Sequence, residues 1–191
     1  RQAEALDAAG VDIRWLRRLA GVPTGTAFIQ VDARGENTIV VVQGANARVA
    51  LPGGDVEARV VVTQNEIPPA AQQAAGELAA RAGARLVINA APAPGSPPPW
   101  YGNADPLVVN EHEAAQLAAS NEAGAGLLRR LRERTGARSV VMTLGERGAL
   151  VDDGTGVHAI PPVVVEQVVD ATGAGDTFVG VLAARLALGE G

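Results

Sequence analysis

Short apolar runs alternate with alanine-rich polar stretches along most of the chain. The apolar runs have strand length and lie at 60–63, 86–89, 107–110, 139–143 and 163–169. The stretches between them have helical spacing and predict helices at about 70–82, 111–119 and 127–135. This alternation is typical of βαβ units, so we expect an α/β fold with a largely parallel sheet and helices on its faces.

Residues 22–46 have a different pattern, because two β-branched runs flank the polar turn D-A-R-G-E-N. This arrangement predicts a β-hairpin. The proline-rich stretch 90–99 predicts a surface loop, and the alternation of strands and helices resumes after it. We therefore expect one partial domain over 1–191, with a hairpin at 24–46 and an α/β part at 55–191.

Composition narrows the class of protein. The 191 residues are 47% hydrophobic and 19% charged, as in a soluble globular domain. A net charge of −5 argues against nucleic acid as a partner, and no apolar run approaches the roughly 18 residues of a membrane span. All 16 basic residues are arginine, which excludes a Walker A lysine, and cysteine is absent. We expect a cytoplasmic protein.

Both ends of the sequence suggest truncation. The sequence starts at Arg1 without a methionine, and it stops soon after an amphipathic run at 178–186. We therefore expect an internal piece of a longer protein.

Polar residues follow several of the apolar runs. In open α/β sheets, ligands bind beyond the carboxyl ends of the strands, so these residues are the candidates for a site. They are Thr63, Gln64, Asn65 and Glu66; Asn110 and Glu113; Thr143, Leu144 and Gly145; and Asp170, Thr172, Gly173, Gly175 and Asp176. We expect four strand ends to converge on one rim.

The last group contains a glycine turn, Gly173-Ala174-Gly175, before a helix that is expected to begin near Asp176. Exposed N–H groups at a helix start bind phosphate, and the helix dipole adds to the attraction. A carboxylate there would repel phosphate unless it accepts the proton of an attacking hydroxyl. Asp176 could equally be the N-cap of the helix, and the two roles are compatible.

Three motifs together resemble one family. The segment D-A-T-G-A-G-D-T-F at 170–178 is similar to the D-T-x-G-A-G-D-x-F signature of the ribokinase-like (PfkB-type) sugar kinases. N-E-H-E at 110–113 matches their N-x-x-E motif, and T-L-G-E-R-G at 143–148 resembles their nucleotide-loop motif T-x-G-x-x-G. Shorter matches begin at Gly21, Gly35, Gly44 and Gln64, so the resemblance covers nearly the whole chain. It implies a three-layer α/β/α fold.

The resemblance also implies roles for individual residues. Asp176 would be the catalytic base and contact the sugar, with Ala174 and Gly175 in the anion hole, and Glu66 would also bind the sugar. ATP would be held by Asn110 and by the loop residues Thr143, Leu144, Gly145, Glu146, Arg147 and Gly148.

Metal ions and a second subunit are implied in the same way. Glu113 would act through Mg²⁺ and its waters, and Asp170 with the carbonyl of Thr172 would belong to a K⁺-type site. The hairpin would form part of a lid over the sugar and mediate a homodimer in the full-length protein.

The expected activity is ATP-dependent phosphorylation of D-ribose to D-ribose 5-phosphate. Alternatives are a related kinase acting on a fructose-type sugar or a nucleoside, or a truncated fragment without activity, because the family's N-terminal and C-terminal parts have no counterpart here.

Ala171 and Ala90 depart from the family pattern without removing a group that has an assigned role. For Asn110 and Glu113, the purely structural alternative is an Asx turn followed by an exposed first-turn carboxylate.

Overall fold

The computed structural model describes residues 2–31, 37–51, 53–54, 56–165, 168 and 170–190. The chain divides into two compact units, 1–54 and 55–191, and each is described by itself. No helix in the described ranges is long and apolar enough to cross a lipid bilayer.

The first unit contains the predicted hairpin. Strands β1 (Thr26–Val31) and β2 (Asn37–Val42) pair antiparallel, with Thr26 opposite Val42 and Val31 opposite Asn37. The two predicted strands are confirmed, whereas the turn residues 32–36 lie outside the described part of the chain. The unit also has a short helix, α1 (Gln2–Ala8), and a 3₁₀ turn, η1 (Gly44–Arg48).

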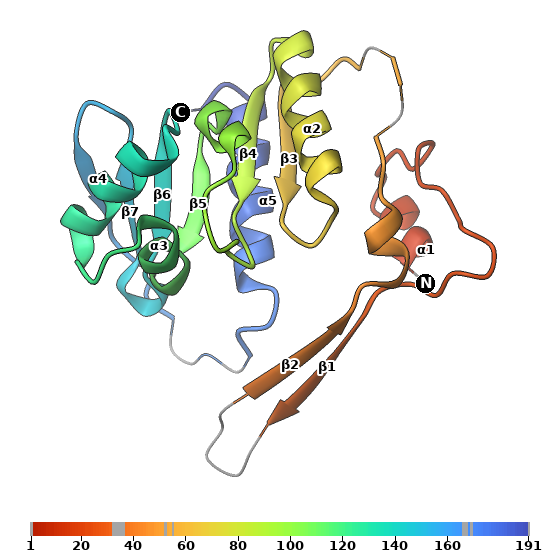
Figure 1. Ribbon diagram of the computed structural model, residues 1–191, viewed down its shortest axis with the longest axis horizontal. Helices are drawn as coiled ribbons and strands as arrows, with labels where there is room; N and C mark the ends of the chain where they lie inside the picture. Colours follow the sequence, from red (N-terminus) through yellow and green to blue (C-terminus); the bar gives the residue numbers. More distant parts are fainter. Residues whose placement is uncertain are drawn as a thin grey trace. The chain divides into compact units, whose positions relative to one another are not determined.

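The second unit is built on a six-stranded sheet with the order β3-β4-β5-β6-β7-β8 (Figure 1). Its first four strands run parallel: β3 (Val60–Gln64), β4 (Arg85–Asn89), β5 (Leu107–Asn110) and β6 (Val140–Thr143). Then β7 (Ala149–Asp152) and β8 (Val157–Ile160) add an antiparallel hairpin at one edge. The predicted α/β fold with a mostly parallel sheet is confirmed.

The prediction of a strand at 163–169 is wrong for those of its residues that the structure describes. Residues 163–165 and 168 belong to no strand, and Val163 and Val164 are almost fully exposed. A run of valines forms a strand only where a neighbouring strand takes up its backbone hydrogen bonds. The described edge of the sheet ends with β8, which is followed at once by two prolines. Three of the four expected strand ends therefore belong to observed strands, those of β3, β5 and β6.

Helices cover both faces of the sheet, as the alternating pattern predicts. They are α2 (Pro69–Ala82), α3 (Glu111–Ala118), α4 (Gly124–Thr135) and α5 (Ala174–Ala187), with 3₁₀ turns η2 (Pro99–Asn103) and η3 (Gly145–Arg147). Ile88 packs in the larger apolar cluster with residues of α2, α3 and α4. Its neighbour Val87 lies in a second cluster with Val179 of α5, on the far side of the sheet in Figure 1. Because side chains alternate along a strand, the two clusters define three layers.

Candidate active site

A hollow of about 330 Å³ lies at the carboxyl ends of the parallel strands, within the second unit. Its walls come from the ends of β4, β5 and β6 and from the first turn of α5. The lining residues are Asn89, Ala91, Val108, Val109, Asn110, Glu113, Thr143, Ala171, Gly173, Ala174, Gly175, Asp176, Phe178 and Val179. We call this the strand-end hollow.

The strand-end hollow brings together residues from all three sequence motifs. Asn110 and Glu113 come from the β5–α3 junction, Thr143 from the end of β6, and Asp176 from α5. Asn89 also lines it and was missed as a candidate. The rule that ligands bind at strand ends would have found it, since Asn89 is the last residue of β4.

The first turn of α5 differs from the predicted one. The N-cap is Gly173, with φ 74°, and the helix begins at Ala174. Asp176 is therefore the third helical residue, and the interpretation of Asp176 as the N-cap is wrong. Gly173 ends the preceding turn in a left-handed conformation that glycine adopts without strain, so the helix can start two residues earlier.

Two backbone donors are free at this helix start. The Ala174 N–H donates to the Ala171 carbonyl at 3.1 Å, and the Thr177 N–H donates to that of Gly173 at 2.9 Å. The N–H groups of Gly175 and Asp176 have no acceptor among the residues that the structure describes. The first N–H groups of a helix have no partner within it, and the helix dipole makes this end attractive to anions. The exposed Asp176 carboxylate thus stands beside a possible phosphate site.

Asn110 and Glu113 form a capping box at the start of α3. The Asn110 side chain accepts a hydrogen bond from the Glu113 N–H at 2.8 Å, and Glu113 Oε2 accepts one from the Asn110 N–H at 2.8 Å. The N-x-x-E motif therefore has a structural role that satisfies two backbone donors. This replaces the alternative of a simple Asx turn with an exposed carboxylate.

The Glu113 carboxyl is half-buried, and burial raises its pKa above the usual range. The hydrogen bond from the Asn110 backbone and the nearby His112 act in the opposite direction on that pKa. Burial thus penalises the Glu113 charge, and a cation in the hollow would relieve this penalty.

The loop at 143–148 is sharply folded, and only Thr143 lines the strand-end hollow. The Leu144 N–H donates to the Gly148 carbonyl at 2.8 Å, which closes the turn around η3. Gly148 has φ 88°, and a Cβ there would lie 2.2 Å from the Ile160 carbonyl oxygen, so the position requires glycine. Arg147 donates to the Glu111 carboxylate at the start of α3. The lining residues do not include Leu144, Gly145, Glu146, Arg147 and Gly148.

Glu66 and the two residues expected to bind K⁺, Asp170 and Thr172, lie outside the lining of the hollow. Glu66 follows β3, is exposed, and donates its backbone N–H to the Gln64 side chain. Asp170 Oδ1 accepts a hydrogen bond from the Thr172 N–H at 2.8 Å, and this bond lowers the pKa of the Asp170 carboxyl. In the described ranges, no group of three or more Asp, Glu, His or Cys side chains could hold a metal ion.

The fold and the strand-end hollow define an α/β protein with a candidate ligand site at the carboxyl edge of its parallel strands. Residues 2–191 match the pfkB family carbohydrate kinases, and the chain belongs to this family.

Curated relatives include the ribokinase of Mus musculus, which is 37% identical over 177 residues and matches 86% of this chain and 54% of its own length. The ribokinase of Staphylococcus aureus is 33% identical over 192 residues, matching 96% of this chain and 63% of its own length. The chain thus spans between about half and two thirds of the length of these two relatives.

Solved structures agree on the fold. The Arabidopsis thaliana ribokinase complexed with ribose and ATP aligns with a TM-score of 0.87 at 26% identity, over 99% of this chain and 65% of that one. The Cryptococcus neoformans ribokinase in complex with ADP aligns at 0.84 and 28% identity, over 99% and 67%. A Burkholderia thailandensis nucleoside kinase in complex with inosine aligns at 0.76 over 96% and 61%; its 22% identity supports the fold alone.

Proposed function

We propose that the protein is an ATP-dependent sugar kinase that converts D-ribose to D-ribose 5-phosphate. The observation that carries the proposal is the first turn of α5, where the exposed Asp176 carboxylate stands beside two free backbone N–H groups. The Mus musculus relative, which is a ribokinase, and the Arabidopsis thaliana ribokinase that was solved with ribose and ATP support ribose as the acceptor.

Asp176 accepts the proton of the terminal sugar hydroxyl as the oxygen attacks the γ-phosphorus of ATP. The new oxygen–phosphorus bond forms while the bond to the β-phosphate oxygen breaks, and ADP leaves. The N–H groups of Gly175 and Asp176 stabilise the charge on the transferred phosphoryl group, and Ala174, expected in the same anion hole, would join them only by giving up its bond to the Ala171 carbonyl. A carboxylate base and an anion hole on one helix turn place the base within reach of the hydroxyl that attacks the phosphate.

ATP binding is assigned to Asn110 and to the loop at 143–148. Asn110 and Thr143 line the strand-end hollow, whereas the rest of the loop follows β6 at the same sheet edge. Glu66 is assigned to the sugar, because the loop after β3 is at that edge too. Binding groups concentrate on such loops.

Metal ions fit two of the carboxylates. Glu113 uses one oxygen in the capping box, and its second oxygen is available to Mg²⁺ or to a water bound to it. Mg²⁺ commonly takes one or two protein carboxylates and completes its shell with water and phosphate, so a larger cluster is not required. When bound, the ion neutralises charge on the ATP phosphates. Asp170, with its lowered pKa, and the carbonyl of Thr172 supply oxygen ligands for K⁺.

The hairpin is assigned to a lid and a homodimer contact. Phe28 and Val40 are opposite each other in the β1–β2 pair, and both side chains are exposed. Such an apolar pair on a two-stranded ribbon is suited to burial against another chain. Phe28→Glu should shift the protein from dimer to monomer in sedimentation velocity, and a dimer that persists would contradict this assignment.

Asp176→Asn tests the proposed base. The variant should bind ATP as the parent does but lose nearly all ribose-dependent ADP release, because the amide cannot accept the proton. Glu133→Gln, an exposed change on α4, is the control and should keep full activity. Retention of more than about a few per cent of the turnover by Asp176→Asn would overturn the assignment, since one general base contributes roughly 10²–10⁴-fold.

A panel of acceptors tests the substrate. Ribose should give a higher kcat/KM than fructose and than a nucleoside such as inosine. Equal kcat/KM for ribose and fructose would argue against a ribose site. ADP release that no acceptor stimulates would refute the kinase proposal for this chain.

A further inference from the structure

Tyr101 of η2 is fully buried, and its hydroxyl forms hydrogen bonds with the side chain of Asn65. Asn65 Nδ2 donates to Tyr101 Oη at 2.8 Å, and Tyr101 Oη donates to Asn65 Oδ1 at 3.1 Å. The same Asn65 amide donates to the Pro92 carbonyl at 2.8 Å, and the Asn65 backbone N–H donates to the Ala91 carbonyl at 3.2 Å. The residue after β3 is thus tied to η2 and to the segment after β4.

The Asn65–Tyr101 contact lies beside the proposed sugar ligand Glu66 and beside the strand-end hollow. Asn65 directly precedes Glu66, the proposed sugar ligand, and Ala91 lines the strand-end hollow. On its other side Tyr101 is close enough to Glu113 for the Glu113 charge to raise the Tyr101 pKa, in addition to the larger effect of burial. Tyr101 therefore contacts the β3 loop, and Asn65 connects it to the segment after β4.

The Glu66 loop has one further tie, a hydrogen bond that the buried Gln72 side chain of α2 donates to the Ile67 carbonyl at 3.1 Å. Glu66 is exposed, and its own backbone contact is the hydrogen bond to Gln64, two residues away. A contact within the loop shapes the turn but does not fix its place relative to the hollow. The bonds of Asn65 to Tyr101, Ala91 and Pro92 cross from one strand end to the next, so they can fix it.

We propose that Asn65 and Tyr101 are positioning residues that hold Glu66 in place for the sugar. The inference rests on the proposed function, because it takes Glu66 as a sugar ligand. Its specific content is that Tyr101 affects sugar binding through Glu66 and leaves ATP binding unchanged.

Tyr101→Phe removes the hydroxyl and keeps the ring in the core. We expect the KM for ribose to rise roughly tenfold, because the Asn65 amide loses its hydroxyl partner and the Glu66 loop loses a tie. The KM for ATP and kcat should stay within about twofold of the parent, because no ATP contact is changed. Asn65→Ala should raise the ribose KM at least as much, because it also removes the hydrogen bond to the Pro92 carbonyl, and the double variant should equal Asn65→Ala.

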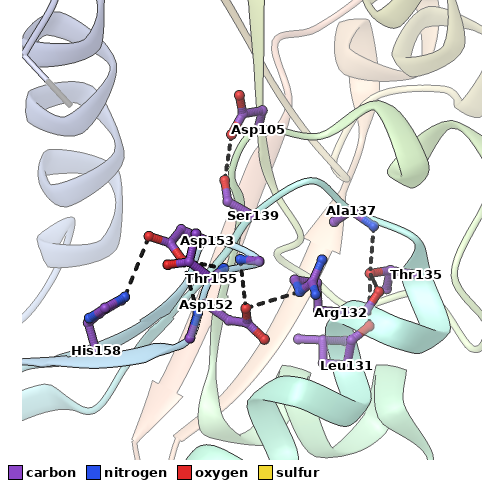
Figure 2. Close-up of polar contacts among 12 residues, drawn as sticks. Asp105, Leu131, Arg132, Thr135, Ala137, Ser139, Asp152, Asp153, Thr155 and His158 are labelled. Carbon is purple, nitrogen blue, oxygen red and sulfur yellow. Dashed lines mark hydrogen bonds and ion pairs between the residues drawn. The ribbon is translucent and has the colours of Figure 1, made fainter.

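Ser139→Ala is a matched control. Its hydroxyl is partly buried and donates to Asp105 Oδ1 at 2.6 Å (Figure 2). Ser139 directly precedes β6, at its amino end, and neither residue lines the strand-end hollow. This variant loses one hydroxyl hydrogen bond, as Tyr101→Phe does, but should keep both KM values.

The decisive test is to introduce Tyr101→Phe into a Glu66→Ala variant. If Tyr101 acts through Glu66, Tyr101→Phe should cause no further rise in the ribose KM of a Glu66→Ala enzyme. A further rise of the same size in that background, or an equal rise of both KM values in Tyr101→Phe alone, would overturn the proposal.

Amide hydrogen exchange separates this inference from the proposed function. An enzyme that phosphorylates no sugar would refute the function, but exchange can still be measured on the whole chain. Faster exchange at Glu66 and Ile67 in Tyr101→Phe than in Ser139→Ala would support the positioning role. Equal exchange in the two variants would overturn it.

Discussion

The capping box of Asn110 and Glu113 allows the structural and functional roles of the N-x-x-E motif to be separated by two substitutions. Asn110→Ala removes the side-chain oxygen that accepts the Glu113 N–H at 2.8 Å. Glu113→Gln removes a charge, but glutamine can still accept the hydrogen bond from the Asn110 N–H, as in other capping boxes. The first variant should therefore lose stability and the second should not.

The size of each effect follows from the contacts. Replacing an N-cap asparagine by alanine costs about 1 kcal/mol, which lowers the melting temperature of a protein of this size by roughly 3 °C. Glu113→Gln should unfold at pH 7 with a free energy at least equal to that of the parent, because the ionised Glu113 is penalised by burial.

The pH dependence has a definite sign. The folded-state pKa of Glu113 is raised, mainly by burial and despite the opposing effects of the Asn110 N–H and His112. Tyr101, whose pKa is also raised, stays neutral across this range. The contribution of Glu113 to stability is thus fully present below its ordinary carboxyl pKa and is lost as the pH rises through the raised value. Glu113→Gln should lack this decline.

The assays are urea unfolding of the parent and both variants at pH 4 and pH 7, and calorimetric titration with ATP and Mg²⁺. Both variants should bind the nucleotide more weakly, Glu113→Gln only when Mg²⁺ is present. Two results would refute the reasoning: an Asn110→Ala variant as stable as the parent, or a Glu113→Gln variant at pH 7 that is destabilised as much as Asn110→Ala.

Three further predictions concern packing and backbone geometry. Leu131→Ala should lower the free energy of urea unfolding by about 2–5 kcal/mol, because Leu131 is fully buried; a loss below about 1 kcal/mol would contradict this. Gly148→Ala should weaken ATP binding in calorimetry, because its Cβ would lie 2.2 Å from the Ile160 carbonyl oxygen; unchanged affinity would exclude the loop from the nucleotide site. Asp152→Ala should cost about 2 kcal/mol in thermal unfolding, because the partly exposed Arg132, whose Nε lies 3.0 Å from Asp152 Oδ1, loses its ion pair (Figure 2); an unchanged melting temperature would contradict this.

The local elements of the second unit could be predicted from the sequence because their signals are local. The predicted helices at 70–82 and 127–135 are observed at Pro69–Ala82 and Gly124–Thr135, where apolar periodicity and a glycine after each helix mark the element. The parallel strands were predicted for the same reason. The antiparallel pair β7 and β8 was not predicted, since its pairing depends on the β6 edge that it meets.

The site was predictable in part. Asn110, Glu113, Thr143 and Asp176 line one hollow, because motifs at the ends of parallel strands meet at one sheet edge. Their chemical roles remain predictions. The strand expected at 163–169 and the N-cap role of Asp176 were wrong, since the first needs a pairing partner and the second depends on the backbone of Gly173.

By itself the sequence determined the alternation of strands and helices, the three motifs and therefore the family, because these are properties of spacing along the chain. Only the tertiary structure decided which motif residues share the strand-end hollow and that Glu66 lies outside its lining. It also placed Tyr101, a residue 36 positions from Asn65, against the loop that carries Glu66. Contacts between distant segments depend on how the layers pack, and no local pattern encodes that packing.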